Sequence, residues 1–273
     1  MQHSTHRPTD HAHRSSGTLA TGVALVIMMV STFIVNGFAG GDSAPGPDAT
    51  TEEIVTFLRH YRAGLQWDLA LRFFILAVLF LPVGIGLARH VRGGERTWLL
   101  PRMIPHLAVW LMAVGAIANT VQGMLLFEGD RLLDEPAVAR ILLLAITALY
   151  LLAMLPHGAI IGVVSEAGRR TRTLPIWLSG LGYLVSVVCL FAVLTMPLSL
   201  GFVDSSAPGV AAGVAYGAIG PWYLITGIVL IVKARRQVRT EPVVVADDDP
   251  STAEPLEIDP TAPDEARTLR FGR

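Results

Sequence analysis

The most regular feature of the sequence is a series of six long apolar segments separated by polar connections. Each segment reaches the roughly 20 apolar residues that an α-helix needs to cross about 30 Å of hydrocarbon. The pattern therefore predicts an all-α integral membrane bundle of six transmembrane helices. These spans lie at approximately 18–39, 68–90, 104–127, 138–164, 175–200 and 208–233.

The connection between the first two spans has a different pattern. Its apolar residues recur at helical spacing, and most of its charged residues lie on the other faces. The apolar residues are Ile54, Phe57, Leu58, Tyr61 and Leu65. Thr50 and Glu53 fit a capping box, in which a hydroxyl and a carboxylate satisfy N–H groups at a helix start. Because this helix is too short and too charged to span, we expect an amphipathic surface helix at about 50–66.

Polar sequence flanks the apolar region at both ends. Residues 1–16 are polar and His-rich, and the segment 241–265 carries nine acidic residues and no basic residue. Such a composition cannot bury a core. We therefore expect disordered tails at 1–16 and 235–273 around a transmembrane domain at 17–234. The histidines of the first tail lack an ordered set of ligands, so no metal site is expected.

The composition supports a membrane protein and limits its chemistry. The chain is 52% hydrophobic and only 16% charged, whereas soluble domains carry about 25% charged residues. Its single cysteine, Cys189, excludes a disulfide framework or a Cys-based zinc site within one chain. The net charge is −1, and no nucleic-acid partner is expected. Nearly all basic residues are arginine, which is typical of a GC-rich bacterial genome.

Basic residues gather in alternate connections along the chain. They occupy the N-terminal tail, the second and fourth connections and the segment after the last span, whereas the first and third connections are acid-rich. Lys and Arg in short loops stay on the cytoplasmic side of a membrane. We therefore expect a protein of the bacterial plasma membrane with both termini in the cytoplasm. An alternative interpretation takes Leu19–Val35 and the small residues that follow as a signal peptide. Cleavage would leave five spans with the other loops on the same sides.

The segment around the amphipathic helix resembles one found in a broad group of uncharacterised actinobacterial membrane proteins. The shared pattern is a helix entry after span one, an aromatic-rich turn with His or Arg, and a second span that ends in L-x-R-x-x-R. The residues that carry it are Pro47, Ala49, Glu52 or Glu53, Ile54, Phe57, His60, Arg62, Leu87, Arg89 and Arg92. This resemblance covers mainly residues 45–95. It implies a six-span bundle with an extracytoplasmic helix after the first span, and no activity or catalytic residues.

Polar residues inside the spans form the strongest candidate site. Arg72 lies about 7 Å below the outer interface at 1.5 Å per residue, and Asp68, one turn earlier, can pair with it. An ionisable group at such a position costs about 2.5–3.5 kcal/mol on insertion scales. We expect an outer polar cluster, capped by the amphipathic helix, that consists of Asp68, Arg72, Asn119, Gln122 and Arg140. Alternatively, Arg72 reaches the headgroups and the two amides only join helices.

Two histidines and two sets of glycines are further candidates. His106 and His157 lie in spans three and four and could ligate haem, although a packing histidine beside a kink at Pro156 is the favoured interpretation. No cofactor is therefore assigned. Small residues let helices approach closely, and intramolecular packing is favoured over a homodimer for both sets. These candidate packing residues are Gly158, Gly162, Gly209, Gly213 and Gly217.

Catalytic motifs are not apparent in the sequence. It contains no G-x-S-x-G, P-loop, H-E-x-x-H or paired carboxylates at a plausible site. We therefore expect a non-enzymatic membrane protein that binds a small molecule, a lipid or a protein partner from the outer side. The alternatives are a small-solute transporter or permease component and a redox protein linked to haem or quinone. Expected partners are membrane lipids, with a second copy of the chain or another membrane protein as further candidates.

Overall fold

The computed structural model describes residues 9–38, 49–92, 99–127, 135–195 and 207–240. Spatial contacts group Met1–Arg239 into one compact unit, and Thr240–Arg273 form a second. The described part consists of seven α-helices and one π-helix. Their bounds are α1 Thr9–Phe38, α2 Thr51–Phe74, η2 Ile75–Phe80, α3 Leu81–His90, α4 Leu99–Phe127, α6 Pro136–Arg170, α7 Ile176–Leu194 and α8 Ala207–Thr240.

Six stretches of these helices are long and apolar enough to cross a membrane. The predicted all-α fold with six spans is confirmed, and the chain is a multi-pass transmembrane protein by helix length and hydropathy. The six stretches are Ser16–Ile34, Arg59–His90, Leu99–Phe127, Arg140–Arg170, Ile176–Leu194 and Gly213–Gln237.

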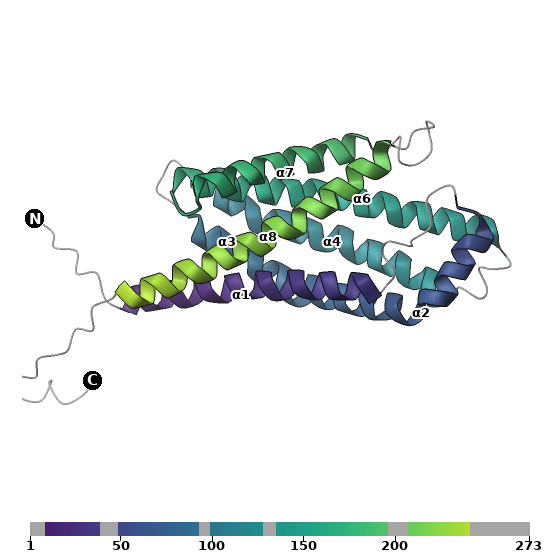
Figure 1. Ribbon diagram of the computed structural model, residues 1–273, viewed down its shortest axis with the longest axis horizontal. Helices are drawn as coiled ribbons and strands as arrows, with labels where there is room; N and C mark the ends of the chain where they lie inside the picture. The colour runs from purple at the N-terminus through teal and green to yellow at the C-terminus, as the bar shows by residue number, and fades with distance from the viewer. Residues whose placement is uncertain (1–8, 39–48, 93–98, 128–134, 196–206, 241–273) are drawn as a thin grey trace, which may run out of the picture. The chain divides into compact units, whose positions relative to one another are not determined.

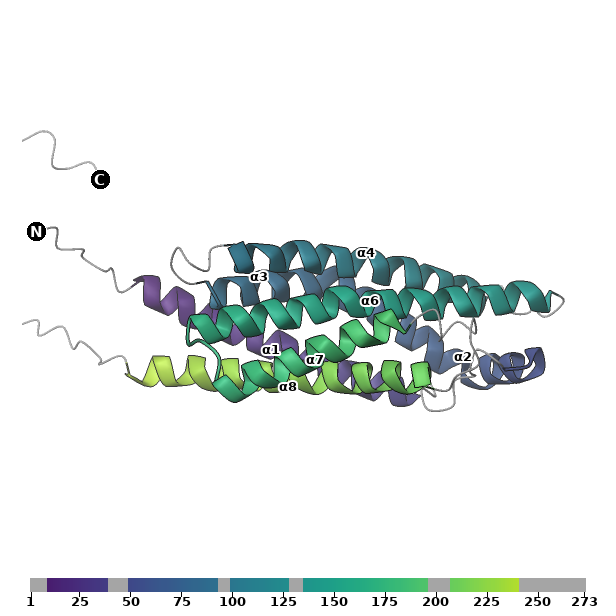
Figure 2. The ribbon, with the colours of Figure 1, turned by 90° about the horizontal axis from the view of Figure 1, so that it is seen from above.

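The helices of the first unit form a bundle with two distinct ends (Figures 1 and 2). The start of α1 and the C-terminal ends of α3, α6 and α8 lie at one end, on the left of Figure 1. There His90 lies 3.5 Å from the Thr18 hydroxyl, and the Lys233 amine donates to the Thr173 carbonyl at 3.1 Å. We call this the basic end, after the described basic residues Arg89, Arg92, Arg102, Arg169, Arg170, Arg172, Lys233, Arg235 and Arg236.

The amphipathic segment and the second span form one continuous helical run. α2 begins at Thr51, so that the predicted amphipathic segment at about 50–66 is helical, and it passes through η2 into α3 without a break. Its first turns cross the end of the bundle opposite the basic end before α2 runs along it (Figure 1). Pro82 near the start of α3 has no N–H to donate to the Val78 carbonyl. The π-helix directly precedes this proline, because wider turns accommodate the missing helical bond.

The capping box predicted at the start of α2 is present. The Thr50 N–H donates to Glu53 Oε2 at 2.7 Å, and the Glu53 N–H donates to the Thr50 hydroxyl at 3.3 Å. The apolar face of the first turns packs inside the protein rather than only against lipid. Phe57 and Tyr61 lie against a small buried cluster formed by Leu65, Leu69 and Leu126 of α4.

Thr50→Ala is expected to loosen only the first turn of α2. Loss of an N-cap hydroxyl costs about 1 kcal/mol of helix stability, which raises the exchange rate of the first-turn amides about fivefold. Hydrogen–deuterium exchange mass spectrometry of the detergent-solubilised protein measures this rate. Thr56→Ala, at an exposed position without a capping role, is the matched control. Equal exchange in the two variants would show that the box does not hold the helix start.

Both terminal helices reach into the predicted tails. α1 begins at Thr9, so that residues 9–16 of the predicted N-terminal tail are helical, and α8 continues to Thr240. A helix nucleated by a long apolar span extends into flanking residues at little cost, because propagation adds one hydrogen bond per residue. Residues 1–8 and 241–273 of the two predicted tails lie outside the described residues.

Close backbone approach joins α8 to α1. A Cβ atom placed on Gly22 would lie 2.7 Å from the Gly227 carbonyl oxygen, and one on Gly227 would lie 2.9 Å from the Gly22 carbonyl oxygen. Only glycine permits this distance. From this crossing α8 runs obliquely toward α6 and α7 (Figure 1). There the Trp222 indole N–H donates to the Leu178 carbonyl at 3.3 Å.

Candidate functional site

The central element of the candidate site is an ion pair on α2. The Arg72 Nε donates to Asp68 Oδ1 at 2.8 Å, across one helical turn. The Asp68 side chain is 4% exposed, whereas the Arg72 side chain is 31% exposed. The pair is therefore oriented, with its negative group inside the protein and its positive group toward the surface.

Tyr150 of α6 connects this ion pair to α4. The Arg72 guanidinium carbon lies 5.1 Å from the centre of the Tyr150 ring, within the range of a cation–π interaction. The Tyr150 hydroxyl lies 2.5 Å from Gln122 Oε1 and 3.2 Å from Asn119 Oδ1. Four of the five residues predicted for the outer polar cluster are thus joined through one tyrosine. We call Asp68, Arg72, Asn119, Gln122 and Tyr150 the Tyr150 cluster.

A fourth helix holds the cluster in place. The Tyr216 hydroxyl of α8 donates to the main-chain carbonyl of Tyr150 at 2.9 Å. The cluster therefore draws on α2, α4 and α6 directly and on α8 through one backbone contact. An arrangement supported by four helices fixes the orientation of Arg72 better than an isolated side chain on a single helix would.

The hydrogen bonds of the cluster leave one amide group unsatisfied. Tyr150 has a single hydroxyl proton, and the shorter distance assigns it to Gln122. Asn119 is 1% exposed, and its Nδ2 has no partner within the described residues. Rotating the Asn119 amide would let Nδ2 donate to the Tyr150 oxygen, but would leave Oδ1 without a donor. Either orientation leaves at least one buried polar atom of Asn119 without a partner in the described part of the chain, which is costly in a protein interior.

Arg140 is the predicted member that the structure does not bring to the cluster. It is exposed near the start of α6, ten residues before Tyr150, which places it about 15 Å away along the helix axis. Among the described residues, no hydrogen bond or ion pair connects it with the other four.

Tyr150 and Tyr216 are the residues that sequence reasoning missed. Tyr150 interrupts the apolar run "LLLAITALYLLAM". A buried tyrosine hydroxyl normally has a hydrogen-bond partner, and tyrosines in membrane proteins favour the interface. Its position deep in a span was therefore a signal that polar groups on other helices face it.

The two candidate haem ligands lie in different surroundings. His157 Nδ1 is 3.4 Å from the Tyr223 hydroxyl, and its ring packs edge-on against Phe80 with centroids 5.6 Å apart. His106 is exposed, next to Pro105 on α4. No contact joins the two histidines within the described ranges. Over the same residues, no group of three or more His, Cys, Asp or Glu side chains could hold a metal ion.

The candidate packing glycines divide into two groups. A Cβ on Gly158 would lie 2.8 Å from Cys189 Cβ, and one on Gly162 would lie 2.8 Å from the Ser186 hydroxyl, so both glycines face α7 closely. A Cβ on Gly213 or Gly217 would meet nothing within 4 Å. The surroundings of Gly209 lie outside the described residues. The close contacts of α8 are instead made by Gly220, against Phe33, and by Gly227, against Gly22.

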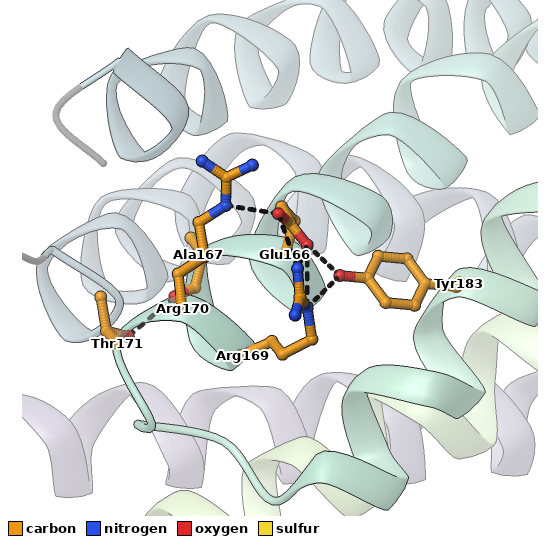
Figure 3. A network of polar contacts seen from close by, with 6 residues as sticks. All are labelled: Glu166, Ala167, Arg169, Arg170, Thr171 and Tyr183. Carbon is orange, nitrogen blue, oxygen red and sulfur yellow. Dashed lines mark hydrogen bonds and ion pairs between the residues drawn. The ribbon is translucent and has the colours of Figure 1, made fainter. Parts of the chain in front are cut away.

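A second polar network closes the turn between α6 and α7 at the basic end (Figure 3). Glu166 accepts hydrogen bonds from Arg169, Arg170 and Tyr183, with Arg169 Nη2 at 3.0 Å. Arg172 follows in the left-handed conformation with φ 54°. The Thr173 N–H donates to the Gly168 carbonyl at 2.9 Å, as in a Schellman helix end. This network has a structural explanation and contains neither a nucleophile nor a pair of carboxylates.

A hollow on the described surface lies away from the Tyr150 cluster. It has a volume of about 610 Å³ along the first turns of α2. Its described lining consists of Thr50, Glu52, Glu53, Thr56, Phe57, His60 and Tyr61. A hollow lined by one helical segment offers no convergent groups from separate elements, so the Tyr150 cluster is the stronger candidate.

Comparison with protein-family models, curated proteins and solved structures finds no match to this chain. The resemblance at residues 45–95 therefore identifies no family, and the structure supports only its six spans. The functional argument consequently depends on the geometry of the site.

Proposed function

We propose that this chain is a non-enzymatic protein of the bacterial plasma membrane that binds a small molecule, a lipid or a protein partner from the outer side. The observation that supports this proposal is the convergence of the Asp68–Arg72 pair and two amides on Tyr150. Ionisable residues within transmembrane segments are costly, and each is therefore a candidate for a functional role. Binding requires no nucleophile or acid–base pair, which agrees with the groups present.

The orientation in this proposal has both termini in the cytoplasm. It is supported by the gathering of basic residues at one end of the bundle, because Lys and Arg near the spans favour the cytoplasmic side. Arg72 lies 18 residues before His90, and Tyr150 lies 19 residues before Arg169. At 1.5 Å per residue, the cluster is about 27 Å from the basic end. It would then face the outer half of the bilayer.

Arg72→Leu is expected to abolish ligand binding. The leucine removes the positive group of the cluster. Tyr150→Phe is expected to weaken binding less than Arg72→Leu, because the aromatic ring that packs against the guanidinium stays. Native mass spectrometry of protein extracted in mild detergent should show a bound species on the wild type, reduced at least tenfold in Arg72→Leu. Arg59→Leu removes an exposed arginine from the same helix and should keep the bound species.

Size-exclusion chromatography and circular dichroism establish that each variant is folded before its mass spectrum is compared. A wild-type protein that carries no bound species would contradict the proposal. Equal binding by the wild type and a folded Arg72→Leu variant would also contradict it, because the cluster would then have no part in binding.

A small-solute transporter is a second candidate, which one group of buried residues favours. Ser165, Ser179 and Thr226 are each 0% exposed, and their hydroxyls have no partner within the described residues. They lie on α6, α7 and α8, nearer the basic end than the Tyr150 cluster. Transporters bind their substrates near the bilayer midplane, and these hydroxyls would add polar groups on the cytoplasmic side of the Tyr150 cluster. Flux of a ligand identified by mass spectrometry into proteoliposomes distinguishes transport from binding alone.

A further inference from the structure

The donors of Arg72 are only partly used by the protein. Nε meets Asp68 Oδ1 at 2.8 Å, and the two Nη nitrogens meet no carboxylate within the described part of the chain. A guanidinium presents five N–H donors in a planar fork that matches the two oxygens of a carboxylate or phosphate. The Nη side of this fork, which meets no carboxylate within the described residues, therefore suits an anionic oxygen pair.

The orientation of the ion pair favours a negatively charged ligand. Asp68 neutralises Arg72, but the Asp68 side chain is only 4% exposed, whereas the Arg72 side chain is 31% exposed. A group that approaches from outside meets the positive end of the pair first. The electrostatic interaction is strong there, because apolar surroundings screen it weakly.

The position of Arg72 within the span favours a ligand that has an apolar part. The exposed residues of the same helical run are large and apolar, although they lie on other faces of the helix than Arg72, and Trp67 is 74% exposed. The others are Phe73, Phe74 and Val78. At about 7 Å below Trp67, such a surface faces hydrocarbon rather than water. A molecule that reaches Arg72 from this side must carry an apolar part.

We propose that Arg72 binds the phosphate or carboxylate of a lipid amphiphile that approaches from within the bilayer. This inference rests on the proposed binding function and names its ligand class. The ring of Tyr150 fixes the guanidinium plane, and the Gln122 amide fixes Tyr150 through its hydroxyl. Arg72 is thus held ready for two parallel hydrogen bonds to the headgroup, while the acyl chain stays in the surrounding hydrocarbon.

The test uses delipidated protein in a maltoside detergent, which supplies no phosphate or carboxylate. Three amphiphiles are added separately, namely phosphatidylglycerol, a long-chain fatty acid and diacylglycerol, and glycerol phosphate is the soluble competitor. Native mass spectrometry measures the bound fraction. At least one of the two anionic amphiphiles is expected to bind about tenfold more tightly than diacylglycerol. Glycerol phosphate at the same concentration should not displace it.

Variants at position 72 distinguish the contribution of the planar guanidinium from that of a positive charge alone. Arg72→Leu should remove the preference for the anionic amphiphile, and Arg72→Lys should retain only part of it, because an ammonium is a point charge without the planar fork. Arg59→Leu should behave as the wild type. Equal binding of diacylglycerol, or displacement by glycerol phosphate, would overturn the inference. Binding that persists in a folded Arg72→Leu variant would overturn it as well.

The outcomes also separate this inference from the proposed function. If protein from cells carries a species that Arg72→Leu removes, but no anionic amphiphile binds to delipidated protein, the inference fails and the proposed function stands. If no species is found on protein from cells and no amphiphile binds, both fail.

Discussion

Asp68→Leu is expected to destabilise the protein by about 2–3 kcal/mol, and adding Arg72→Leu is expected to restore most of that loss. Removal of one partner from a buried ion pair costs about 3–5 kcal/mol, because the other charge is left uncompensated. We take a lower value because the Arg72 side chain is 31% exposed and can reach toward the headgroups. When both charges are absent, neither has to be buried.

Unfolding in mixed micelles with increasing sodium dodecyl sulfate measures these free energies. The cycle of two single variants and the double variant isolates the pairwise interaction. Glu52→Leu, at an exposed acid on the same helix, is the control and should change stability by less than about 0.5 kcal/mol. A double variant whose loss equals the sum of the two single losses would show that Asp68 and Arg72 do not interact.

Gly22→Ala is expected to lower the free energy of unfolding by about 1–3 kcal/mol, the usual cost of overpacking. The added methyl group would lie 2.7 Å from the Gly227 carbonyl oxygen and 3.1 Å from the Ile231 backbone nitrogen. Since both neighbours belong to the backbone of α8, the two helices must move apart. Gly22→Leu should prevent the crossing altogether.

Gly17→Ala is the matched control for this contact. Gly17 lies on the same helix, and an added Cβ would meet nothing within 4 Å. Alanine favours helix over glycine by up to about 1 kcal/mol, so this variant should be neutral or slightly more stable. The same unfolding assay compares the two. A Gly22→Ala protein as stable as Gly17→Ala would mean that α1 and α8 do not cross at Gly22 and Gly227.

The six spans could be predicted from the sequence because each is a continuous apolar run of sufficient length. Their ends could not be predicted as well. Hydropathy does not show that α1 begins at Thr9, because helical hydrogen bonds continue into polar sequence.

Within the candidate site, the local part was predictable and the non-local part was not. Asp68 and Arg72 are one turn apart on one helix, and this spacing alone predicts their contact. Tyr150 meets them only because α6 is rotated so that this residue faces α2 and α4. A nearly uniform apolar run does not specify that rotation. Arg140 lies on the same side of the membrane as the cluster, but ten residues of α6 separate it from Tyr150, about 15 Å along the helix axis.

The packing glycines show the same limit. The spacing of Gly213 and Gly217 defines a face of small residues but does not say which helix meets it. The structure places the closest approach of α8 at Gly227, opposite Gly22. Spacing within one helix therefore identifies faces that allow close packing, and the arrangement of the whole bundle decides which of them are used.

Photo-crosslinking in living cells tests the central claim, ligand binding at the Tyr150 cluster, most directly. A benzophenone amino acid replaces Phe73, which is exposed and follows Arg72 in the sequence, or Phe191, which is exposed on α7. We expect the probe at position 73 to capture one enriched amphiphile, and Arg72→Leu to remove that product while products at position 191 stay unchanged. Identical products at both positions, unaffected by Arg72→Leu, would contradict the account.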